Sequence, residues 1–442
     1  MQNNYLTKPM SMALELLGRI SSSEKINQWH LREPALKLVY QSLCQSVRVG
    51  KMAQTRFFAS RPLIPEEKLS KNKPLKKDIF DLTLTREQQM VRDELLKFSR
   101  QNMRPMARDA DNGDIPADFF DQINALGLAV SGVPEAIQGV GQVRSPISNM
   151  LMAEDLSYGD MSLAIAALAP SGFVNALTEF GSLDQQARYL PSFTKDKFMP
   201  ASIALMEPSV RFIPDQLKTT AVSTNAGYRL NGMKCLVPLG MQSELFVVFA
   251  RLDNHGPRGF IVERHYPGIE IEIERNMGLA AASMSRLVLT DVELPKSALL
   301  GEQEVHYSHE RMIDLSRISI CALAVGTCQA VLDYVTKYAN ERIAFGEPIS
   351  NRQAVAFMIA DMAIELESMR MLTYRAASRA EQGLPFHRNA YLAQVMCAER
   401  AMKIGTDGLQ ILGGHGFVCE YPLELWYRQL RAVGILEGSL LI

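Results

Sequence analysis

The spacing of apolar residues changes twice along the chain, from a helical period to a strand period and back again. Between about residues 83 and 197, apolar positions recur at helical spacing, and Thr85 is a candidate N-cap for the first helix of this region. From about Phe198 the period shortens: Leu245–Ala250 is a continuous apolar run, and Ile269–Glu274 alternates between apolar and acidic residues. Both patterns predict strands, and the turns between them indicate a compact antiparallel β domain.

The helical period returns after Gly301 and predicts two long helices. The first spans Arg317–Ala339, and the second runs from near Ser350 to Gly383, which is a candidate C-cap. Apolar positions in the second helix step by four and three, as in a core-facing stripe of an antiparallel bundle. They are Val355, Ile359, Met362, Leu366 and Met369. The predicted order is therefore helices, a small β domain, and helices.

A basic arm, residues 1–77, precedes these regions. It holds 14 Lys/Arg and 5 Asp/Glu, whereas the whole chain has a net charge of −1. Two blocks of helical apolar spacing, Met10–Ile20 and Leu36–Val47, come before a linker rich in Pro and Lys, Arg61–Lys77. We therefore expect four regions: the arm 1–77, helices in 78–197, the β domain in 198–303, and helices again in 304–442.

The cysteines and the arm indicate the compartment. Six cysteines without a CxxC pair predict reduced thiols, no metal site and a cytoplasmic protein. The basic amphipathic blocks favour peripheral contact with the inner face of a membrane or with a partner protein, and the alternative is an extension that packs on its own subunit. A mitochondrial matrix location is a further alternative, although Glu15, Glu24 and Glu33 interrupt the acid-poor pattern of a presequence. Nucleic acid is not expected as a partner, because the arm lacks interleaved basic and aromatic residues.

One apolar segment could be mistaken for a membrane span. Met161–Thr178 has no charged residue over 18 positions, which is near the lower limit of length for a spanning helix. Pro170, Ser171 and Asn175 interrupt it. The whole chain is 47% hydrophobic and 21% charged, as soluble globular proteins are, so we predict a buried core helix.

Four local motifs follow one another in the last third of the chain: Asp314-Leu315-Ser316-Arg317, Glu341–Gly346 with Gln353, Gly413-Gly414-His415-Gly416, and Ile435–Ser439. In this order and spacing they resemble the acyl-CoA dehydrogenase family, and the resemblance extends from about Leu82 to Ile442. It implies an α+β fold that is mainly α, with an N-terminal α-helical domain, a middle small β-barrel domain and a C-terminal four-helix bundle. It also implies an FAD-dependent enzyme that oxidises a fatty acyl-CoA to a trans-2-enoyl-CoA.

The resemblance assigns the catalytic base to Glu437. The α-proton of a thioester is weakly acidic, so this carboxylate must be desolvated and its pKa raised. Gly438 would lie against the substrate, and Asp314 and Arg317 would grip the CoA thioester, because an arginine fork suits phosphate. From their spacing alone, Asp314 and Arg317 would form a surface ion pair that contributes little to stability. Ser316 stands where one branch of the family carries its base, and a serine there cannot serve as one.

The flavin contacts that the resemblance implies come from several parts of the chain. They are Met206, Arg342, Phe345, Gln353, Gln410, Gly413, Gly414 and Ser439. In the family the arginine, the glutamine at 353 and the glycine turn act across a subunit boundary, so a homodimer or homotetramer is implied. Electrons would pass to an electron-transfer flavoprotein or a similar acceptor.

The middle domain departs from the family pattern where the flavin would bind. Met206 and Pro238 stand where the family has threonines, and Leu236 where it has a tryptophan. Arg211-Phe212-Ile213 replaces Gly-Ser-Asp, and Leu441 replaces a glutamine near the base. Each lost buried hydrogen bond costs about 0.5–1.5 kcal/mol. Two interpretations remain open: a divergent enzyme that binds FAD through backbone groups and its C-terminal motifs, or an acyl-CoA-binding or scaffold protein that has lost FAD.

Overall fold

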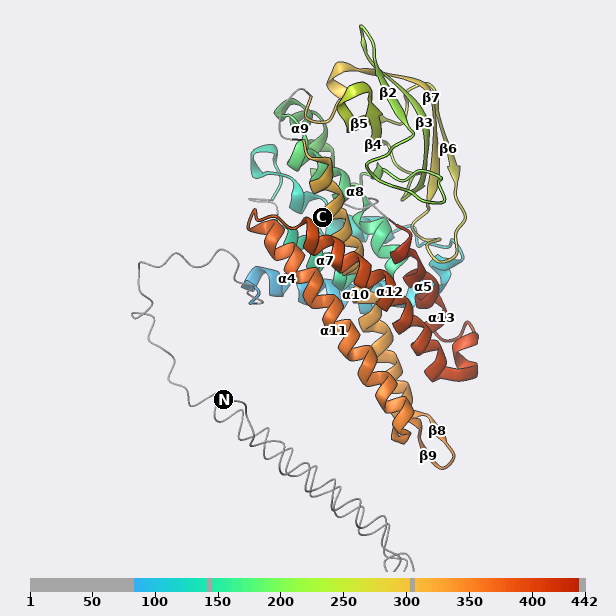
Figure 1. The fold of residues 1–442 in the computed structure, drawn as a ribbon. Coiled ribbons are helices and arrows are strands. Elements are labelled where there is room, and N and C mark those ends of the chain that lie inside the picture. The colour runs from blue at the N-terminus through green and yellow to red at the C-terminus, as the bar shows by residue number, and fades with distance from the viewer. Residues whose placement is uncertain (1–82, 141–144, 303–306, 437–442) are drawn as a thin grey trace, which may run out of the picture. The chain divides into compact units, whose positions relative to one another are not determined.

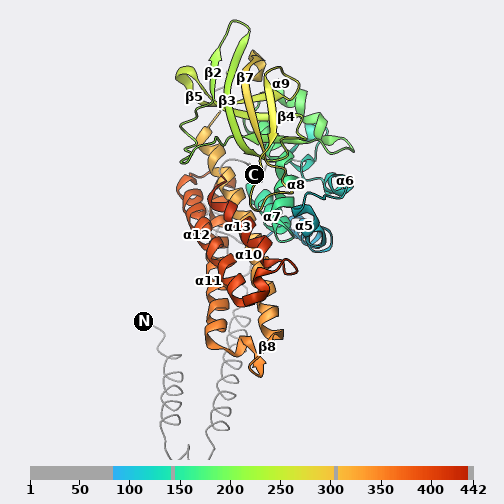
Figure 2. The same cartoon turned by 90° about the vertical axis from the view of Figure 1, so that its right-hand side faces the viewer.

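The computed structural model describes residues 83–140, 145–302 and 307–436, all within the unit that runs from Lys77 to Ile442. The predictions for the basic arm, and for Glu437 and the residues after it, lie outside the described residues. Helices form both ends of the described chain and a β-sheet forms the middle, which confirms the predicted fold class (Figures 1 and 2).

The first helix of the N-terminal domain begins at the predicted cap. The Gln88 N–H donates to Thr85 Oγ1 (3.2 Å), and the Thr85 N–H donates to Gln88 Oε1 (3.0 Å), so two otherwise unpaired donors are satisfied. A π-helical turn, Ser99–Met103, continues this helix into the next one. The helices are α4 Arg86–Phe98, α5 Arg104–Asp111, α6 Phe119–Ala125, α7 Pro146–Ser157, α8 Met161–Phe180 and α9 Leu183–Tyr189.

The uncharged segment at Met161 is a core helix, as predicted. Among the described residues two helices, α8 and α10 (His309–Glu341), are long and apolar enough to cross a membrane by length and composition. However, 94% and 78% of their most apolar windows are buried inside the protein. Core helices of soluble proteins have the same properties.

The middle domain is a seven-stranded sheet in the order β1-β4-β2-β3-β7-β6, with β5 on β4. Both β1 and β2 run parallel to β4, so the expectation of an antiparallel domain is wrong for these two pairings. β4 pairs with three strands, which explains why nearly all of its residues are buried. The strands are β1 Ala201–Ala204, β2 Thr220–Ser223, β3 Gly227–Val237, β4 Leu245–Leu252, β5 Gly256–Glu263, β6 Ile269–Ile273 and β7 Ser285–Pro295.

A buried ion pair fixes the segment that leaves β1. Lys234 Nζ lies 2.8 Å from Glu207 Oε1, and both side chains are buried. The backbone N–H groups of Lys218 and Thr219 donate to the same carboxylate at 2.7 and 2.9 Å. Although burial opposes ionisation, these partners hold the pKa of Glu207 below its usual value. The pair therefore ties the segment carrying Met206 to β3.

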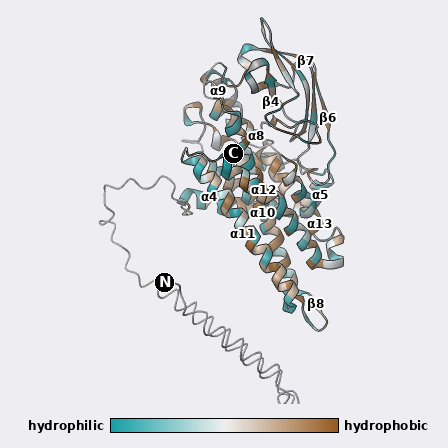
Figure 3. Ribbon diagram, in the orientation of Figure 1, coloured by the Kyte–Doolittle hydropathy of each residue, from teal (hydrophilic) through white to brown (hydrophobic). Residues whose placement is uncertain are grey.

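The described part of the C-terminal domain, residues 307–436, contains three long helices and a short one. Gly383 follows the second long helix with φ +66°, which confirms the predicted glycine stop. The first long helix, α10, extends beyond the predicted Arg317–Ala339 at both ends. Apolar positions run along these helices (Figure 3). The elements are α10 His309–Glu341, β8 Ile343–Ala344, β9 Glu347–Pro348, α11 Gln353–Glu381, α12 His387–Leu412 and α13 Leu423–Leu430.

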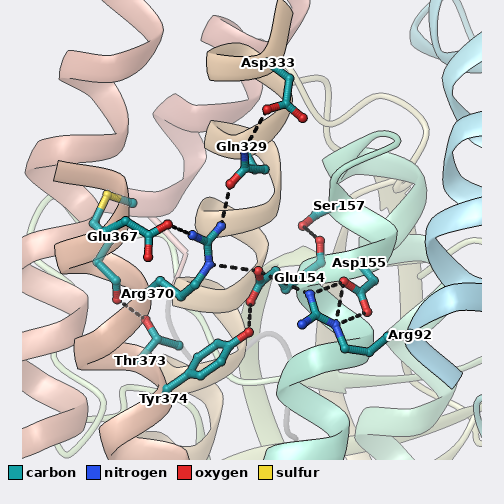
Figure 4. Close-up of polar contacts among 11 residues, drawn as sticks. Arg92, Glu154, Asp155, Ser157, Gln329, Asp333, Glu367, Arg370, Thr373 and Tyr374 are labelled. Carbon is teal, nitrogen blue, oxygen red and sulfur yellow. Dashed lines mark hydrogen bonds and ion pairs between the residues drawn. The ribbon is translucent and has the colours of Figure 1, made fainter. Parts of the chain in front are cut away.

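Two buried carboxylates of α7 pair with arginines, one from the C-terminal helix α11 and one from α4 of the same N-terminal domain (Figure 4). Arg370 Nε of α11 lies 3.1 Å from Glu154 Oε1 of α7, and Arg92 Nη2 of α4 lies 2.8 Å from Asp155 Oδ1. Burial raises the pKa of Asp155 to about 6 although Arg92 opposes the shift. Beside them α7 and α10 pack closely: a Cβ on Gly326 would lie 1.9 Å from the Glu154 carbonyl oxygen.

Candidate functional site

Asp314 and Arg317 lie one turn apart near the start of α10. Arg317 Nη1 is 3.3 Å from Asp314 Oδ1, and the two side chains are only 13% and 2% exposed. Burial raises the pKa of Asp314, and the neighbouring His387 and Arg317 oppose that shift. Between them along the helix, the hydroxyl of Ser316 is buried and has no hydrogen-bond partner among the described residues. The pair is therefore a buried polar site rather than the surface ion pair that spacing alone favours.

Two side chains from the first turns of α12 complete this cluster, and sequence reasoning missed both. His387 Nδ1 lies 3.0 and 3.1 Å from the two carboxylate oxygens of Asp314. One turn later, the Tyr391 ring centre lies 5.7 Å from the Arg317 guanidinium carbon. Only the tertiary packing of α12 on α10 brings these residues together, and no local motif marks them.

The residues of the middle domain that would face a flavin are mostly apolar. Met206 is buried, and its carbonyl accepts from the Cys235 N–H at 2.9 Å. Leu236 has φ +50°, and its N–H already donates to Glu274 Oε2 at 2.7 Å. Pro238 has no N–H, and its carbonyl accepts from Ser202 Oγ at 2.7 Å. This wall therefore offers few hydrogen-bond donors.

The chain approaches this wall again at its C-terminal end. Leu436 is buried and lines a cavity of about 90 Å³ together with Leu236, Gly278 and Leu279. The cavity lies where the middle domain meets the segment after α13. The next residues, Glu437, Gly438 and Ser439, lie outside the described residues, so their assigned roles stay predictions.

Polar contacts of α13 fix the segment that ends at Leu436. Arg428 Nη2 lies 2.6 Å from Asp111 Oδ2 of α5, and its Nη1 donates to the Met277 carbonyl at 2.8 Å. Gln429 Nε2 donates to Asp160 Oδ2, the cap of α8, at 2.5 Å. Partly buried charge pairs of this kind hold orientation well. The segment that ends in Leu436 is thus anchored to both the N-terminal and the middle domain.

The remaining predicted flavin residues lie at the opposite end of the bundle. All of them are exposed to solvent, and they are Arg342, Phe345, Gln353, Gln410, Gly413 and Gly414. The hydroxyl of Tyr338, near the end of α10, lies 2.8 Å from His415 Nδ1, which brings the glycine turn beside the end of this helix. His415 also stacks on Tyr421 with ring centres 4.6 Å apart. His415 is therefore held as part of this turn.

One chain does not bring its two groups of flavin residues together. Asp314 lies near the start of α10 and Arg342 directly follows its end, and 28 residues at a helical rise of 1.5 Å each separate them by about 40 Å. The β8–β9 hairpin accordingly lies at the far end of the bundle from the sheet (Figures 1 and 2). Arg342, Phe345 and Gln353 can therefore meet a flavin on the middle domain only if that domain belongs to another copy of the chain.

The described residues fit a flavin well at the far end and in part at the middle domain. A Cβ on Gly413 or Gly414 would meet open space, and the side chains of Arg342 and Gln353 are exposed donors nearby. Such donors and thin backbone suit a pyrophosphate. At the middle domain, Met206, Leu236 and Pro238 supply an apolar wall in place of side-chain hydrogen bonds.

Family profiles match three consecutive parts of the chain. The acyl-CoA dehydrogenase N-terminal domain matches residues 85–197, the middle domain 202–292 and the C-terminal domain 306–441. An acyl-CoA dehydrogenase of Bacillus subtilis is 31% identical, over 80% of this chain and 95% of that protein. The mitochondrial short-chain specific acyl-CoA dehydrogenase of Rattus norvegicus is 33% identical, over 79% and 86%.

Solved structures show the same similarity. Butyryl-CoA dehydrogenase from Megasphaera elsdenii superposes with a TM-score of 0.75 at 29% identity, over 81% of this chain and 96% of that one. A chain from work on the electron transferring flavoprotein of Acidaminococcus fermentans gives 0.73 at 32% identity, with the same coverage. PigA in complex with FAD gives 0.74 at 25% identity, again with this coverage.

Proposed function

Because the chain belongs to the acyl-CoA dehydrogenase family, we propose that it oxidises the Cα–Cβ bond of a fatty acyl-CoA, yielding a trans-2-enoyl-CoA. The observation that carries this proposal is the buried pair of Asp314 and Arg317 on α10. In the sequence, Glu437 directly follows the segment that α13 anchors. Similarity to butyryl-CoA and short-chain enzymes supports a fatty acyl thioester as substrate.

The thioester would bind against α10. Arg317 can donate two parallel hydrogen bonds to a phosphate or carbonyl oxygen of the ligand, and Asp314 can accept from an amide N–H. The Ser316 hydroxyl is buried without a partner among the described residues. Since a buried hydroxyl left unpaired costs free energy, we expect a polar ligand atom or the terminal segment to satisfy it.

Glu437 would remove the α-proton. The anchoring of α13 through Arg428 and Gln429 brings the chain to the junction with the middle domain, where Leu436 is buried. To serve as the base, the Glu437 carboxylate would have to be poorly solvated. Its pKa would rise toward the operating pH, as a general base requires.

FAD would be held by two copies of the chain. The apolar wall of Met206 and Leu236 would face the flavin ring, while Arg342, Gln353 and the Gly413-Gly414 turn of a second copy would face its pyrophosphate and adenosine. The chemistry that FAD supplies when bound is acceptance of the hydride from Cβ. A homodimer or homotetramer follows from this arrangement, and an electron-transfer flavoprotein is the proposed acceptor of the electrons.

A second candidate function is acyl-CoA binding without FAD. It is favoured by the wall formed by Met206, Leu236 and Pro238, which offers few hydrogen-bond donors to a flavin. The Leu236 N–H, a backbone donor on this wall, is already used by Glu274. In this case the chain would bind the thioester and leave it unchanged.

Product analysis separates the two functions. Purified protein, supplied with FAD, a saturated acyl-CoA and an artificial electron acceptor, should form a 2-enoyl thioester that chromatography detects. Glu437→Gln should lower the rate by roughly 10²–10⁴-fold, and Glu420→Gln, at an exposed position, should not. Binding of the thioester without any product would support the non-enzymatic alternative.

The basic arm remains a separate proposal. Contact of residues 1–77 with a membrane or a partner protein, and with it a peripheral cytoplasmic location, rests on their charge and amphipathic spacing. Flotation of the full chain with anionic liposomes would test it, and failure to float would remove the membrane from consideration.

A further inference from the structure

We propose that His387 is a positioning residue of the acyl-CoA site, holding the Asp314 carboxylate beside Arg317 and making thioester binding stronger when its ring is protonated. The inference rests on the proposed function, since it concerns the same pair on α10. His387 comes from a different helix, α12, and its charge would make binding depend on pH.

The geometry places His387 between Asp314 and solvent. Its Nδ1 is 3.0 Å from Asp314 Oδ2, and the histidine side chain is 54% exposed while that of Asp314 is 2% exposed. Nδ1 can act as a hydrogen-bond donor to the carboxylate in one neutral tautomer and in the charged form. His387 thus orients the carboxylate from the solvent side, and Arg317 orients it from within the helix.

Tyr391 supports the same arrangement from the next turn of α12. Its ring lies 5.7 Å from the guanidinium carbon of Arg317, within the distance at which a ring face attracts a cation. The start of α12 therefore contributes one side chain to each member of the pair on α10. Two such contacts from one helix indicate a built site rather than a chance surface contact.

The charges around His387 determine how its protonation would change the binding of an anionic ligand. From α10, Glu310, Asp314 and Arg317 face it, and Glu310 Oε1 lies 4.0 Å from Nδ1. With a neutral ring these groups sum to −1, and with a charged ring they sum to zero. A CoA thioester carries several phosphate charges, so the protonated site opposes it less.

Neighbouring elements add further charged groups around His387. Arg311 lies over the ring of Phe386, 5.3 Å from its centre, and pairs with Glu179 of α8 at 2.5 Å. Arg379 of α11 donates to the Pro385 carbonyl at 2.9 Å. Arg388 follows His387 on α12. Among these described groups only His387 carries an imidazole, so the test for a pH response is made at this residue.

A metal ion is the competing explanation for the same three side chains. Ligand atoms of Glu310, Asp314 and His387 lie within 4.8 Å of one another. However, Arg317 Nη1 is 3.3 Å from Asp314 Oδ1, and its fixed positive charge would repel a divalent cation. The arrangement therefore favours an anionic organic ligand over a metal.

The test measures the Kd of butyryl-CoA by calorimetry at about pH 6 and about pH 8. We expect wild type to bind roughly three- to tenfold more tightly at the lower pH. His387→Gln, which keeps a donor but no titrating ring, should lose most of this difference, and His387→Ala should also bind more weakly at both pH values. A small difference in Kd between the two pH values that remains in His387→Gln would come from titration of the ligand's own phosphates.

His265→Gln is the matched control. His265 is also an exposed histidine beside a carboxylate, 3.6 Å from Glu263 Oε2, and its variant should keep the wild-type pH response. An unchanged pH response in His387→Gln would overturn the inference while leaving the proposed function intact. Absence of binding by wild type at both pH values would overturn both. Added Zn²⁺ that binds wild type but not His387→Ala would favour the metal site instead.

Discussion

At the scale of single residues, Asp160 has the most direct consequence for stability. Its Oδ1 accepts the Leu163 N–H at 2.8 Å, and its Oδ2 accepts from Gln429 at 2.5 Å. Burial raises its pKa to about 6, compared with about 3.9 in an unfolded chain. At intermediate pH the folded state therefore holds a proton that the unfolded state has lost, and the free energy of unfolding falls as pH rises through this window.

Asp160→Asn should remove this pH dependence, because the amide oxygen can still accept at the cap but does not titrate. Relative to the variant, wild type should lose roughly 3 kcal/mol of unfolding free energy between about pH 4 and about pH 6, and little more above that range. Denaturant unfolding at a series of pH values measures the difference. Asp196→Asn, at an exposed position, is the control, and parallel pH curves for wild type and Asp160→Asn would contradict the assignment.

Single residues also mark what the sequence could and could not reveal about the site. Asp314 and Arg317 could be found because they share a helix face and a known motif. His387 could not, because 73 residues separate it from Asp314 and only the packing of α12 brings them together. The burial of Asp314 and Arg317 could not be predicted either, because the spacing of residues on a helix does not show which elements pack over them.

At the scale of elements, the close packing of α7 and α10 depends on Gly326. A Cβ there would lie 1.9 Å from the Glu154 carbonyl oxygen and 2.3 Å from Ser157 Oγ. Because the first contact is with backbone, the helices must separate, and Gly326→Ala should lower the free energy of unfolding by more than about 2 kcal/mol. Thermal and denaturant unfolding check this.

Gly405→Ala is the matched control, since it is also a helical glycine. Its Cβ would meet the end of a flexible side chain, Leu430 Cδ1, at 3.2 Å, and alanine gains about 1 kcal/mol of helix propensity over glycine. We expect it to be neutral or slightly stabilising. Equal effects of the two substitutions would show that helix separation is not the cause.

Elements were predictable where their signals are local. The Thr85 cap, the alternating strand at Ile269 and the glycine stop at Gly383 all depend on neighbours within a few residues. The parallel pairing of β1 and β2 with β4 was not predictable, because apolar alternation fixes which face is buried but not the direction of the neighbouring strand.

At the scale of the whole molecule, the separation of about 40 Å along α10 underlies the proposal that a second copy completes the flavin site. Phe345 is 94% exposed at the tip of the β8–β9 hairpin, with φ +56°, a conformation that non-glycine residues rarely adopt. In the proposed assembly this side chain would lie at the contact between two copies of the chain. Phe345→Glu should therefore reduce both the oligomeric mass and the amount of bound flavin.

Light scattering after size-exclusion chromatography measures the mass, and absorbance measures the flavin. Leu183→Glu replaces another exposed apolar residue, 80% exposed on α9, and should change neither quantity. If Phe345→Glu keeps the wild-type mass and flavin content, the far end of the bundle does not complete the site of another copy.

The architecture of the whole chain followed from its changing apolar period, and the family followed from the order of its motifs. The separation of Arg342 from Asp314 was not predicted, because the helix expected at Arg317–Ala339 contained neither residue. The small cavity beside Leu236 could not be predicted, because it depends on how α13 and the middle domain pack.

The most direct test of the central claim is the visible absorption spectrum of the purified protein during anaerobic addition of a saturated acyl-CoA. The account predicts an oxidised flavin band near about 450 nm that bleaches with the thioester in wild type and fails to bleach in Glu437→Gln. A protein that stays colourless after FAD is supplied would contradict it, and acyl-CoA binding without redox chemistry would then be the function of this chain.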